Sequence, residues 1–396
     1  MAKISCASFG IKRSRLVLNI AAGVLILCVG YAVISHDMID LRLGFGLEIQ
    51  DESQVLSKQL DAILMLENDA PKQQFLNPCD GSNYACTQNC SNPLSTNTKE
   101  RIKNILSSRS LTLHRNQSDL LSVMVDHIPE SDVIFLSASS SNHYEEMQAM
   151  FENLHTNVYP KVENFTFVLV DIGLTKQQRN ITEHHCRCLV VTFPFENFPK
   201  HVRDTHCYSW KPLIIRAVIE KARKMLVYMD ASIRWTKKID VVMKRADKYG
   251  LQLSRFTSSA RITVHTMREM FEYSHETVCA FAPFPEINAY TGLYKRDDLI
   301  IKTILNPWAR CALEATCMCP VNPYQVIHCN VAPADHKCHR FDQSSLGIMT
   351  AKLYGSDIYK ILMPNMTQFF DIKRNVKNPY YFNSTIDKAI TAIAPK

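Results

Sequence analysis

Apolar and polar positions divide the chain into three regions. Residues 16–34 form an uncharged, mostly apolar run, and at about 1.5 Å per residue these nineteen residues match the roughly 30 Å hydrocarbon core of a bilayer. Residues 49–66 repeat apolar positions at helical spacing, with Ile49, Leu56 and Ile63 seven apart. From about residue 132, short apolar runs alternate with amphipathic stretches. The pattern predicts a membrane-spanning helix, a stem with one amphipathic helix, and a folded domain.

The folded domain is predicted to alternate strands with helices. Strands are expected over 133–138, 165–170, 189–193 and 225–229, and helices over 144–154 and 210–222. Strands that alternate with helices favour a mostly parallel sheet covered on both faces. The predicted fold class is α/β, with a mixed, mostly parallel sheet flanked by helices.

The charges around the first apolar run predict its orientation. Four basic residues precede it, no acidic residue occurs before Asp37, and basic segments stay in the cytosol. The sequence therefore predicts a single-pass type II protein of the Golgi or endoplasmic reticulum membrane. Its expected parts are a cytosolic tail over 1–15, a bilayer anchor over 16–34, a lumenal stem with a Cys-rich linker over 35–128, and a lumenal domain over 129–396. A homodimer through the stem is a further expectation.

A cleaved signal peptide is the alternative to the anchor, with Gly30 and Ala32 at its cleavage site. The apolar run is longer than the usual signal core of about 7–15 residues, which favours the anchor. Both interpretations place the remaining chain in the secretory pathway.

Sequons and cysteines agree with that compartment. Sequons for N-glycosylation occur beyond the anchor at Asn89, Asn116, Asn164, Asn180, Asn365 and Asn383. Twelve of the fourteen cysteines also lie beyond it, and an oxidising lumen favours disulfides. The group Cys311, Cys317, Cys319, Cys329 and Cys338 is predicted to form disulfides, because its spacing does not match the paired C-x₂₋₄-C of zinc sites.

Composition and missing motifs exclude several function classes. The net charge is +7, of which the four basic residues of the tail supply +4, so the rest of the chain is not a nucleic-acid binder. The sequence has no G-x-G-x-x-G after a strand, no P-loop, no H-E-x-x-H and no G-x-S-x-G. Rossmann dehydrogenases, P-loop enzymes, HExxH zinc proteases and nucleophile-elbow hydrolases therefore lose support.

Candidate chemistry follows the fourth predicted strand. Asp230 and Ser232 come at its carboxyl end, where ligands bind in α/β sheets. Two oxygen-bearing residues at i and i+2 project to one side of an extended chain, and a paired Asp-x-Asp there can hold a cation. Ser232 replaces the second acid and is a weaker ligand. The alternative for Asp230 is a residue that only caps the turn.

Two further segments belong with it. Trp210 and Lys211 begin the helix before this strand, where a cation and helix amides meet phosphates, although a lone lysine there is more often merely exposed. His339, Arg340, Asp342 and Gln343 precede an apolar helical stretch and offer a metal ligand, a phosphate clamp and partners for sugar hydroxyls. Asp342 as a simple helix N-cap is the alternative.

These segments carry a resemblance to a known family. Residues 133–354 resemble an uncharacterised family, a domain of unknown function, of single-pass secretory proteins whose core is similar to GT-A, nucleotide-sugar glycosyltransferases. The resemblance rests on five segments: Ser137–Tyr144, Tyr208–Pro212, Tyr228–Arg234, Pro307–Cys311 and His339–Ser344.

The resemblance implies a glycosyltransferase that moves a sugar from a nucleotide-sugar donor to a glycan or protein acceptor, with Mn²⁺ as an expected cofactor. Asp230 would stand at the metal and donor-phosphate position, and the pair Asp342 and Gln343 is similar to the Asp-Gln pair that contacts the donor sugar in related transferases. His339, the ligand that the residues themselves offer, is the second expected metal ligand. Lys211, Trp210, Ser232 and Arg340 complete the expected donor site. Among the acids Asp297, Asp298, Glu314 and Asp342, we expect Asp342 and Glu314 to be catalytic. The alternative is a non-catalytic lumenal or surface protein that retains the fold, which the departure at Ser232 favours.

Overall fold

The structure, a computed structural model of the chain, describes residues 48–49, 51–66, 94–255, 260–329, 338–379 and 381–382. The predicted tail and anchor, most of the Cys-rich linker, Asn89 and Asn383 lie outside these residues. In the part of the chain that the structure describes, no helix has both the length and the apolar character needed to cross a bilayer. The chain divides into two compact units, Met1–Glu52 and Ser53–Lys396, and the second contains every feature discussed below.

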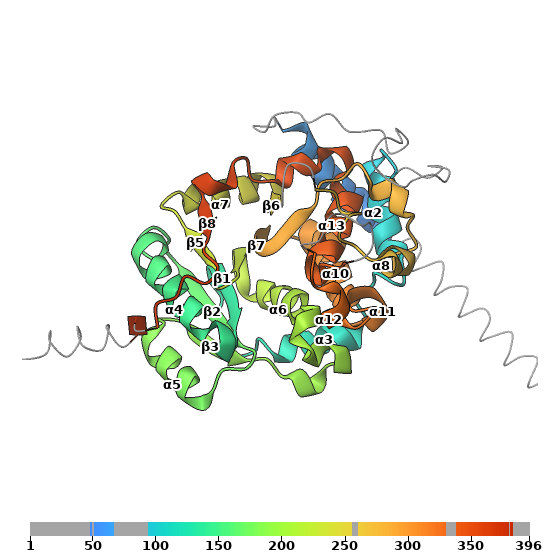
Figure 1. Cartoon of the computed structure of the whole chain (residues 1–396). Coiled ribbons are helices and arrows are strands. Elements are labelled where there is room, and N and C mark those ends of the chain that lie inside the picture. The colour runs from blue at the N-terminus through green and yellow to red at the C-terminus, as the bar shows by residue number, and fades with distance from the viewer. Residues whose placement is uncertain are drawn as a thin grey trace, which may run out of the picture. The chain divides into compact units, whose positions relative to one another are not determined.

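A six-stranded mixed sheet forms the centre of the second unit (Figure 1). Its strands, in spatial order, are β3 (Leu189–Thr192), β2 (Phe165–Asp171), β1 (Ser131–Ser139), β4 (Ala222–Met229), β7 (Ile287–Lys295) and β6 (Leu251–Arg255). The four strands from β3 to β4 are parallel, whereas β7 is antiparallel to both of its neighbours. The predicted α/β class with a mostly parallel, mixed sheet is confirmed.

Helices cover both faces of the sheet because the central strands are apolar on both sides. In β1, Ile134 and Leu136 face a core built with helices that include α2, α3, α6, α10 and α13. Val133 and Phe135 face the opposite core, which contains α4 and α7. The helices are α2 (Thr98–Ser107), α3 (Arg115–Val123), α4 (Tyr144–Asn153), α5 (Lys176–His185), α6 (Trp210–Val218), α7 (Ile239–Tyr249), α8 (Arg268–Tyr273), α9 (Asp298–Ile300), α10 (Asn306–Ala312), α11 (Ala315–Met318), α12 (Pro323–Val326) and α13 (Phe341–Tyr354).

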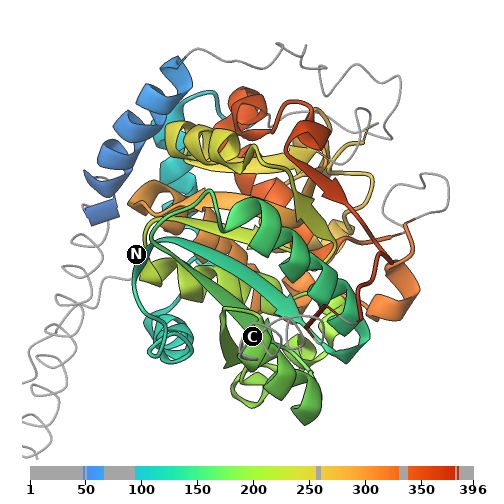
Figure 2. The same cartoon turned by 90° about the vertical axis from the view of Figure 1, so that its left-hand side faces the viewer.

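The described part of the predicted stem belongs to the same compact unit as residues 129–396. Leu56 and Leu60 on the helix over 51–65 are buried in the first core, together with residues of α2 and α3. The Gln59 side-chain amide donates to Asp297 Oδ2 at 3.1 Å, which ties this helix to the segment just before α9. Figure 2 shows the helix, in blue, packed along the body of the molecule. The described residues between 53 and 128 therefore pack into the same core as the rest of this unit.

A strap near the carboxyl end of the chain crosses the end of β4. The strand β8 (Phe370–Ile372) pairs antiparallel with β5 (Ile233–Trp235), and the following Lys373 amide donates to the Ser232 carbonyl at 2.8 Å. Residues 373–379 then run to α4, where the Asn378 amide donates to the Glu145 carbonyl at 3.2 Å. Figure 1 shows this segment, in dark red, passing from β8 towards α4. We call residues 370–379 the C-terminal strap.

Candidate functional site

The strand order reverses direction at the carboxyl ends of β1 and β4. From β1 the chain adds β2 and β3 on one side, and then adds β4 on the other side of β1. Such a reversal is the topological switch point at which open α/β sheets bind ligands. Asp230 directly follows β4 at this point, and its amide donates to the Tyr290 carbonyl of β7 at 2.8 Å. The fold therefore presents Asp230 where the sequence predicts it.

Lys211 joins Asp230 to Asp342 at the switch point. The Lys211 ammonium lies 3.2 Å from Asp230 Oδ1 and 3.0 Å from Asp342 Oδ2, and it donates to the Ala289 carbonyl at 3.3 Å. Lys211 comes from the first turn of α6 and Asp342 from the first turn of α13. The side chains of Lys211 and Asp342 are 5% and 7% exposed, against 33% for Asp230. Of these three groups, only the Asp230 carboxylate reaches the surface to a substantial degree.

Electrostatics keep the Lys211 ammonium charged. Burial lowers the pKa of Lys211, but the carboxylates of Asp230 and Asp342 outweigh burial, so its pKa is raised overall. Burial raises the pKa of Asp342, although Lys211 opposes the shift. The Tyr228 hydroxyl donates to Asp230 Oδ1 at 2.6 Å, and burial raises the pKa of that phenol well above its usual value. Two donors therefore already serve one oxygen of Asp230.

A second polar network centres on Glu286, a residue that the sequence analysis does not identify. Its carboxylate is 3.2 Å from Arg340 Nε, accepts from the Gln343 side chain at 2.6 Å, and lies 2.6 Å from His265 Nδ1. The Glu286 side chain is only 6% exposed. It therefore fixes two predicted donor-binding residues, Arg340 and Gln343. The only sequence signal is an acid immediately before the apolar strand β7.

Arg374 on the C-terminal strap is the second residue that the sequence does not indicate. It is exposed, and within the described ranges it makes no ion pair or side-chain hydrogen bond. Burial raises the pKa of Tyr208 and Tyr290, and at both phenols the charge of Arg374 acts against that rise while Asp230 adds to it. Arg374 and Asp230 are thus within electrostatic range of the same two rings.

Ser232 and Trp210 lie close to this centre in the fold. Ser232 is buried two residues after Asp230, and its carbonyl is tied to the strap. Trp210 is 6% exposed, and its indole N–H has no hydrogen-bond partner in the described part of the chain. A buried, unsatisfied donor next to Lys211 is compatible with a ligand contact.

Two other side chains singled out from the sequence, His339 and Glu314, make structural contacts, as does Trp308 of the segment Pro307–Cys311. His339 is 1% exposed, and its Nδ1 accepts the Met267 amide at 3.3 Å. Glu314 pairs with Arg310, and no described contact connects Glu314 with Lys211 or Asp230. Trp308 is fully buried and donates to the Asp342 carbonyl and to Ser345 Oγ, both at 3.0 Å, which is a structural role.

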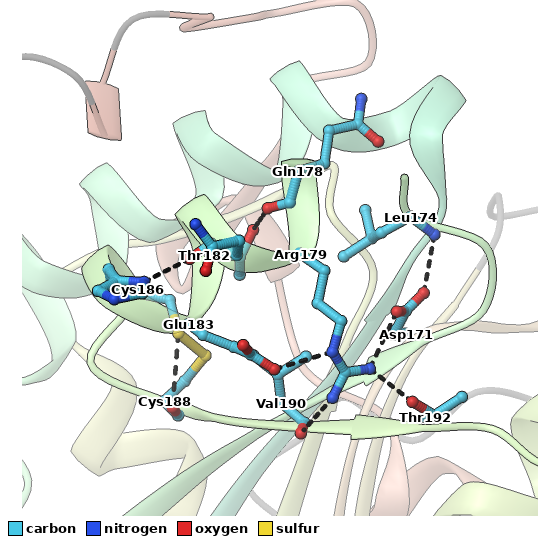
Figure 3. A network of polar contacts seen from close by, with 12 residues as sticks. Asp171, Leu174, Gln178, Arg179, Thr182, Glu183, Cys186, Cys188, Val190 and Thr192 are labelled. Atoms are coloured by element: carbon cyan, nitrogen blue, oxygen red, sulfur yellow. Dashed lines mark hydrogen bonds and ion pairs between the residues drawn. A yellow bond between two sulfur atoms is a disulfide. The ribbon is translucent and has the colours of Figure 1, made fainter. Parts of the chain in front are cut away.

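Asp171, at the carboxyl end of β2, shows how another acid on the same sheet edge is used. Its Oδ1 accepts the amides of Gly173 and Leu174, and its Oδ2 lies 3.1 Å from Arg179 of α5. Figure 3 shows Arg179 also bonded to Glu183, Thr192 and the Val190 carbonyl. This network satisfies Asp171 internally, so Asp230 remains the exposed acid at the switch point.

The disulfide prediction for the cysteine-rich group is confirmed. Cys311 pairs with Cys317, Cys319 with Cys207, and Cys329 with Cys338. A further bridge joins Cys186 to Cys188. His265, Cys329 and Cys338 have ligand atoms within 4.8 Å of one another, but both sulfurs belong to one disulfide and cannot bind a metal as thiolates.

The residues at the switch point do not fit a resident divalent cation. The Lys211 ammonium already lies between the two carboxylates that would bridge such an ion. Ser232 stands where a second acid would be needed, and His339 is buried with no described contact to Asp230. A like charge so close to both acids disfavours a bound cation.

Comparisons with known proteins agree with the resemblance to an uncharacterised family. Residues 80–216 match a family model described as "Protein of unknown function (DUF1647)". This span contains two of the five resembling segments, Ser137–Tyr144 and Tyr208–Pro212. No curated protein matches the sequence.

Solved structures similar to this chain include several glycosyltransferases. The galactosyltransferase LgtC, solved with donor and acceptor sugar analogues, has 11% identity, covers 66% of this chain and 97% of its own, and gives a TM-score of 0.34. Mouse xyloside xylosyltransferase 1 has 10% identity, 59% and 84% coverage, and a TM-score of 0.34. Core-mannan synthase A from Aspergillus fumigatus, in a Mn/GDP form, has 7% identity, 58% and 72% coverage, and a TM-score of 0.32.

Proposed function

We propose that the chain is a glycosyltransferase that binds a nucleotide-sugar donor at the switch point between β1 and β4. The observation that supports this most is the position of Asp230, an accessible carboxylate held by a buried Lys211–Asp342 pair. Lys211 and Asp342 come from the first turns of α6 and α13, so the fold fixes the orientation of Asp230 before a ligand arrives. A polar group positioned in this way on rigid elements is what a binding site requires.

The side chains around Asp230 suggest how the donor is held. The Asp230 carboxylate can accept hydrogen bonds from sugar hydroxyls, and the Gln343 side-chain amide can both accept and donate them. Arginine guanidinium groups match phosphate oxygens, and Arg340 and Arg374 supply two of them. The reaction would be displacement at the anomeric carbon. An acceptor hydroxyl oxygen would form the new glycosidic bond and release its proton to solvent, while the bond to the diphosphate breaks and the nucleoside diphosphate leaves towards the arginines. Asp342 is buried against Lys211 and is therefore assigned a positioning role instead of the expected catalytic one.

The compartment is part of the proposal. A type II protein anchored through residues 16–34 would hold this site in the lumen of the Golgi or endoplasmic reticulum, where an acceptor glycan or protein is modified. The disulfides between described cysteines and the exposed sequon residues Asn116, Asn164, Asn180 and Asn365 fit that environment.

Binding of nucleotide sugars to the full-length protein tests the activity. A panel of UDP- and GDP-sugars at millimolar concentration should raise the melting temperature for at least one donor, and slow release of the nucleoside diphosphate should follow. Asp230→Asn should weaken binding of that donor at least tenfold, which corresponds to about 1.4 kcal/mol. Asp247→Asn is the matched control, because its side chain is 72% exposed and, among the described residues, pairs only with Lys295.

Two outcomes would contradict the proposal in different ways. No binding of any nucleotide or nucleotide sugar would remove the glycosyltransferase interpretation altogether. Binding without release of nucleotide or transfer to any acceptor would favour the non-catalytic alternative, which the replacement of a second acid by Ser232 supports.

A further inference from the structure

We propose that this chain binds the diphosphate of its donor without a divalent cation, and that Arg374 of the C-terminal strap takes the phosphate charge instead. The inference rests on the proposed function, because it concerns the same site. It differs from the expectation that Mn²⁺ is a cofactor.

Lys211 already acts as the internal cation of the site. Its ammonium lies 3.2 Å from Asp230 and 3.0 Å from Asp342, and its side chain is only 5% exposed. A divalent ion that bridged the same carboxylates would be adjacent to a buried positive charge. That charge cannot move away, because α6 places it there and the Ala289 carbonyl accepts a hydrogen bond from it at 3.3 Å.

The site also offers few free carboxylate oxygens to a cation. Oδ1 of Asp230 is shared by the Tyr228 hydroxyl and the Lys211 ammonium, and Oδ2 of Asp342 is bound to Lys211. Ser232 supplies no charge at the i+2 position. A carboxylate whose charge is compensated in this way is suited to accept hydrogen bonds from sugar hydroxyls, because it orients a neutral ligand without attracting a second cation.

Arg374 lies on a fixed part of the C-terminal strap. Hydrogen bonds on either side of it fix the strap: the Lys373 amide donates to the Ser232 carbonyl at 2.8 Å, and the Asn375 amide donates to Glu146 Oε1 at 3.2 Å. Arg374 therefore extends from a backbone that is anchored two residues beyond Asp230. Its guanidinium is exposed and makes no ion pair or hydrogen bond in the described ranges.

Arg340 cannot take this role alone. Its Nε lies 3.2 Å from the buried carboxylate of Glu286, which compensates its charge, and its side chain is 23% exposed. Arg374 is thus the cation available to neutralise an incoming diphosphate. The planar fork of an arginine binds two phosphate oxygens at once, which a lysine at the same position would not do.

Calorimetric titration of the full-length protein with UDP and GDP tests the proposal. We expect the better nucleotide to bind in the presence of EDTA with a dissociation constant within about threefold of the value in Mn²⁺. Arg374→Gln should weaken that binding at least tenfold, a loss of about 1.4 kcal/mol. The melting temperature of the ligand-free variant should stay that of the wild type, because Arg374 is exposed. Lys377→Gln is the matched control, since it removes a cation of the same strap that pairs with Glu145 at 3.1 Å, and it should bind nucleotide as the wild type does.

The outcomes separate this inference from the proposed function. Nucleotide binding that disappears in EDTA and returns with Mn²⁺ would overturn the inference and leave the glycosyltransferase proposal intact. Wild-type affinity in Arg374→Gln would overturn the role of Arg374. The absence of nucleotide binding in both EDTA and Mn²⁺ would instead overturn the proposed function on which the inference rests.

Discussion

His339 lies in the folded protein as a neutral side chain. Its ring is 1% exposed, its Nδ1 accepts a backbone amide, and burial lowers its pKa to about 3. Burial also lowers the pKa of His155 and His201, which are less completely enclosed. At a pH between its lowered folded pKa and about 6.5, each of these rings gains a proton when the chain unfolds. Acid therefore favours unfolding through these histidines.

This gives a prediction for His339→Gln. Between pH 6.5 and pH 3 the unfolded state binds more protons at this position than the folded state, so the free energy of unfolding falls as the pH falls. From pH 7 to pH 5 the contribution of His339 is about 2 kcal/mol, at about 1.4 kcal/mol per pH unit below 6.5. Urea unfolding at pH 7 and pH 5 measures how much free energy of unfolding each protein loses between the two values. The loss in His339→Gln should be smaller than the loss in the wild type by about 2 kcal/mol. The exposed His184→Gln should keep the wild-type difference. Equal losses in all three proteins would mean that His339 is protonated in the folded state.

Single residues of the site differ in how well the sequence predicts them. Asp230 is predictable, because an acid at the end of an apolar strand belongs at the ligand-binding edge of a parallel sheet. Lys211 is predicted near it, but its contact with two carboxylates is not, since Asp342 lies far away in the sequence. Glu286 and Arg374 give no spacing signal at all. Only the folded chain brings them to the site.

At the scale of elements, the parallel part of the sheet follows from apolar runs, whereas β6 and β7 do not. In β7, Gly292 weakens the strand signal in the sequence. The structure explains it: a Cβ at Gly292 would lie 2.7 Å from the Tyr294 hydroxyl and 2.9 Å from a Leu253 methyl. A side chain at this position would force a shift of the buried ends of Tyr294, in the same strand, and Leu253, in β6. A feature that weakens the sequence pattern is thus needed for the packing.

Two of the disulfides connect elements over very different lengths of chain. Cys207, just before α6, pairs with Cys319 after α11, at a sequence separation of 112. Cys311 and Cys317 join α10 to α11 at a separation of 6. Because a cross-link restricts the unfolded chain more when it closes a longer loop, the first bridge should stabilise the fold more than the second.

We therefore expect unequal losses when each bridge is removed. The double variant Cys207→Ala/Cys319→Ala should lower the free energy of unfolding by about 5 kcal/mol, and Cys311→Ala/Cys317→Ala by about 2 kcal/mol, on the loop-entropy relation. Chemical denaturation of both variants beside the wild type measures the difference. A larger loss for the short bridge would show that packing around Cys311 and Cys317, which are fully buried, outweighs the loop term.

At the scale of the whole molecule, the predicted stem is the main difference from the sequence analysis. Helical periodicity indicates which face of a helix is apolar, but not what covers that face. The structure covers Leu56, Leu60 and Ile63 with the first core of the domain. The Thr98 hydroxyl of α2 donates to Asp61 Oδ1 at 2.7 Å, so helix and domain are also joined by polar contacts. Truncation at residue 128 would expose this core.

The surface of the molecule leads to a prediction about its compartment. Asn116, Asn164, Asn180 and Asn365 are all exposed in the structure, so each can be reached by a glycosylating enzyme. If residues 16–34 place the domain in the lumen, the protein made in a secretory cell should carry glycans that an endoglycosidase removes, with a stepwise loss of mass. Replacing these four residues by Gln should leave at most the glycans on the two remaining sequons, Asn89 and Asn383.

Since a cytosolic chain would be both unglycosylated and reduced, the same preparation should also show Cys207 bonded to Cys319 in non-reducing peptide mapping. Full-length protein without glycans and with free thiols at these two positions would place the domain in the cytosol.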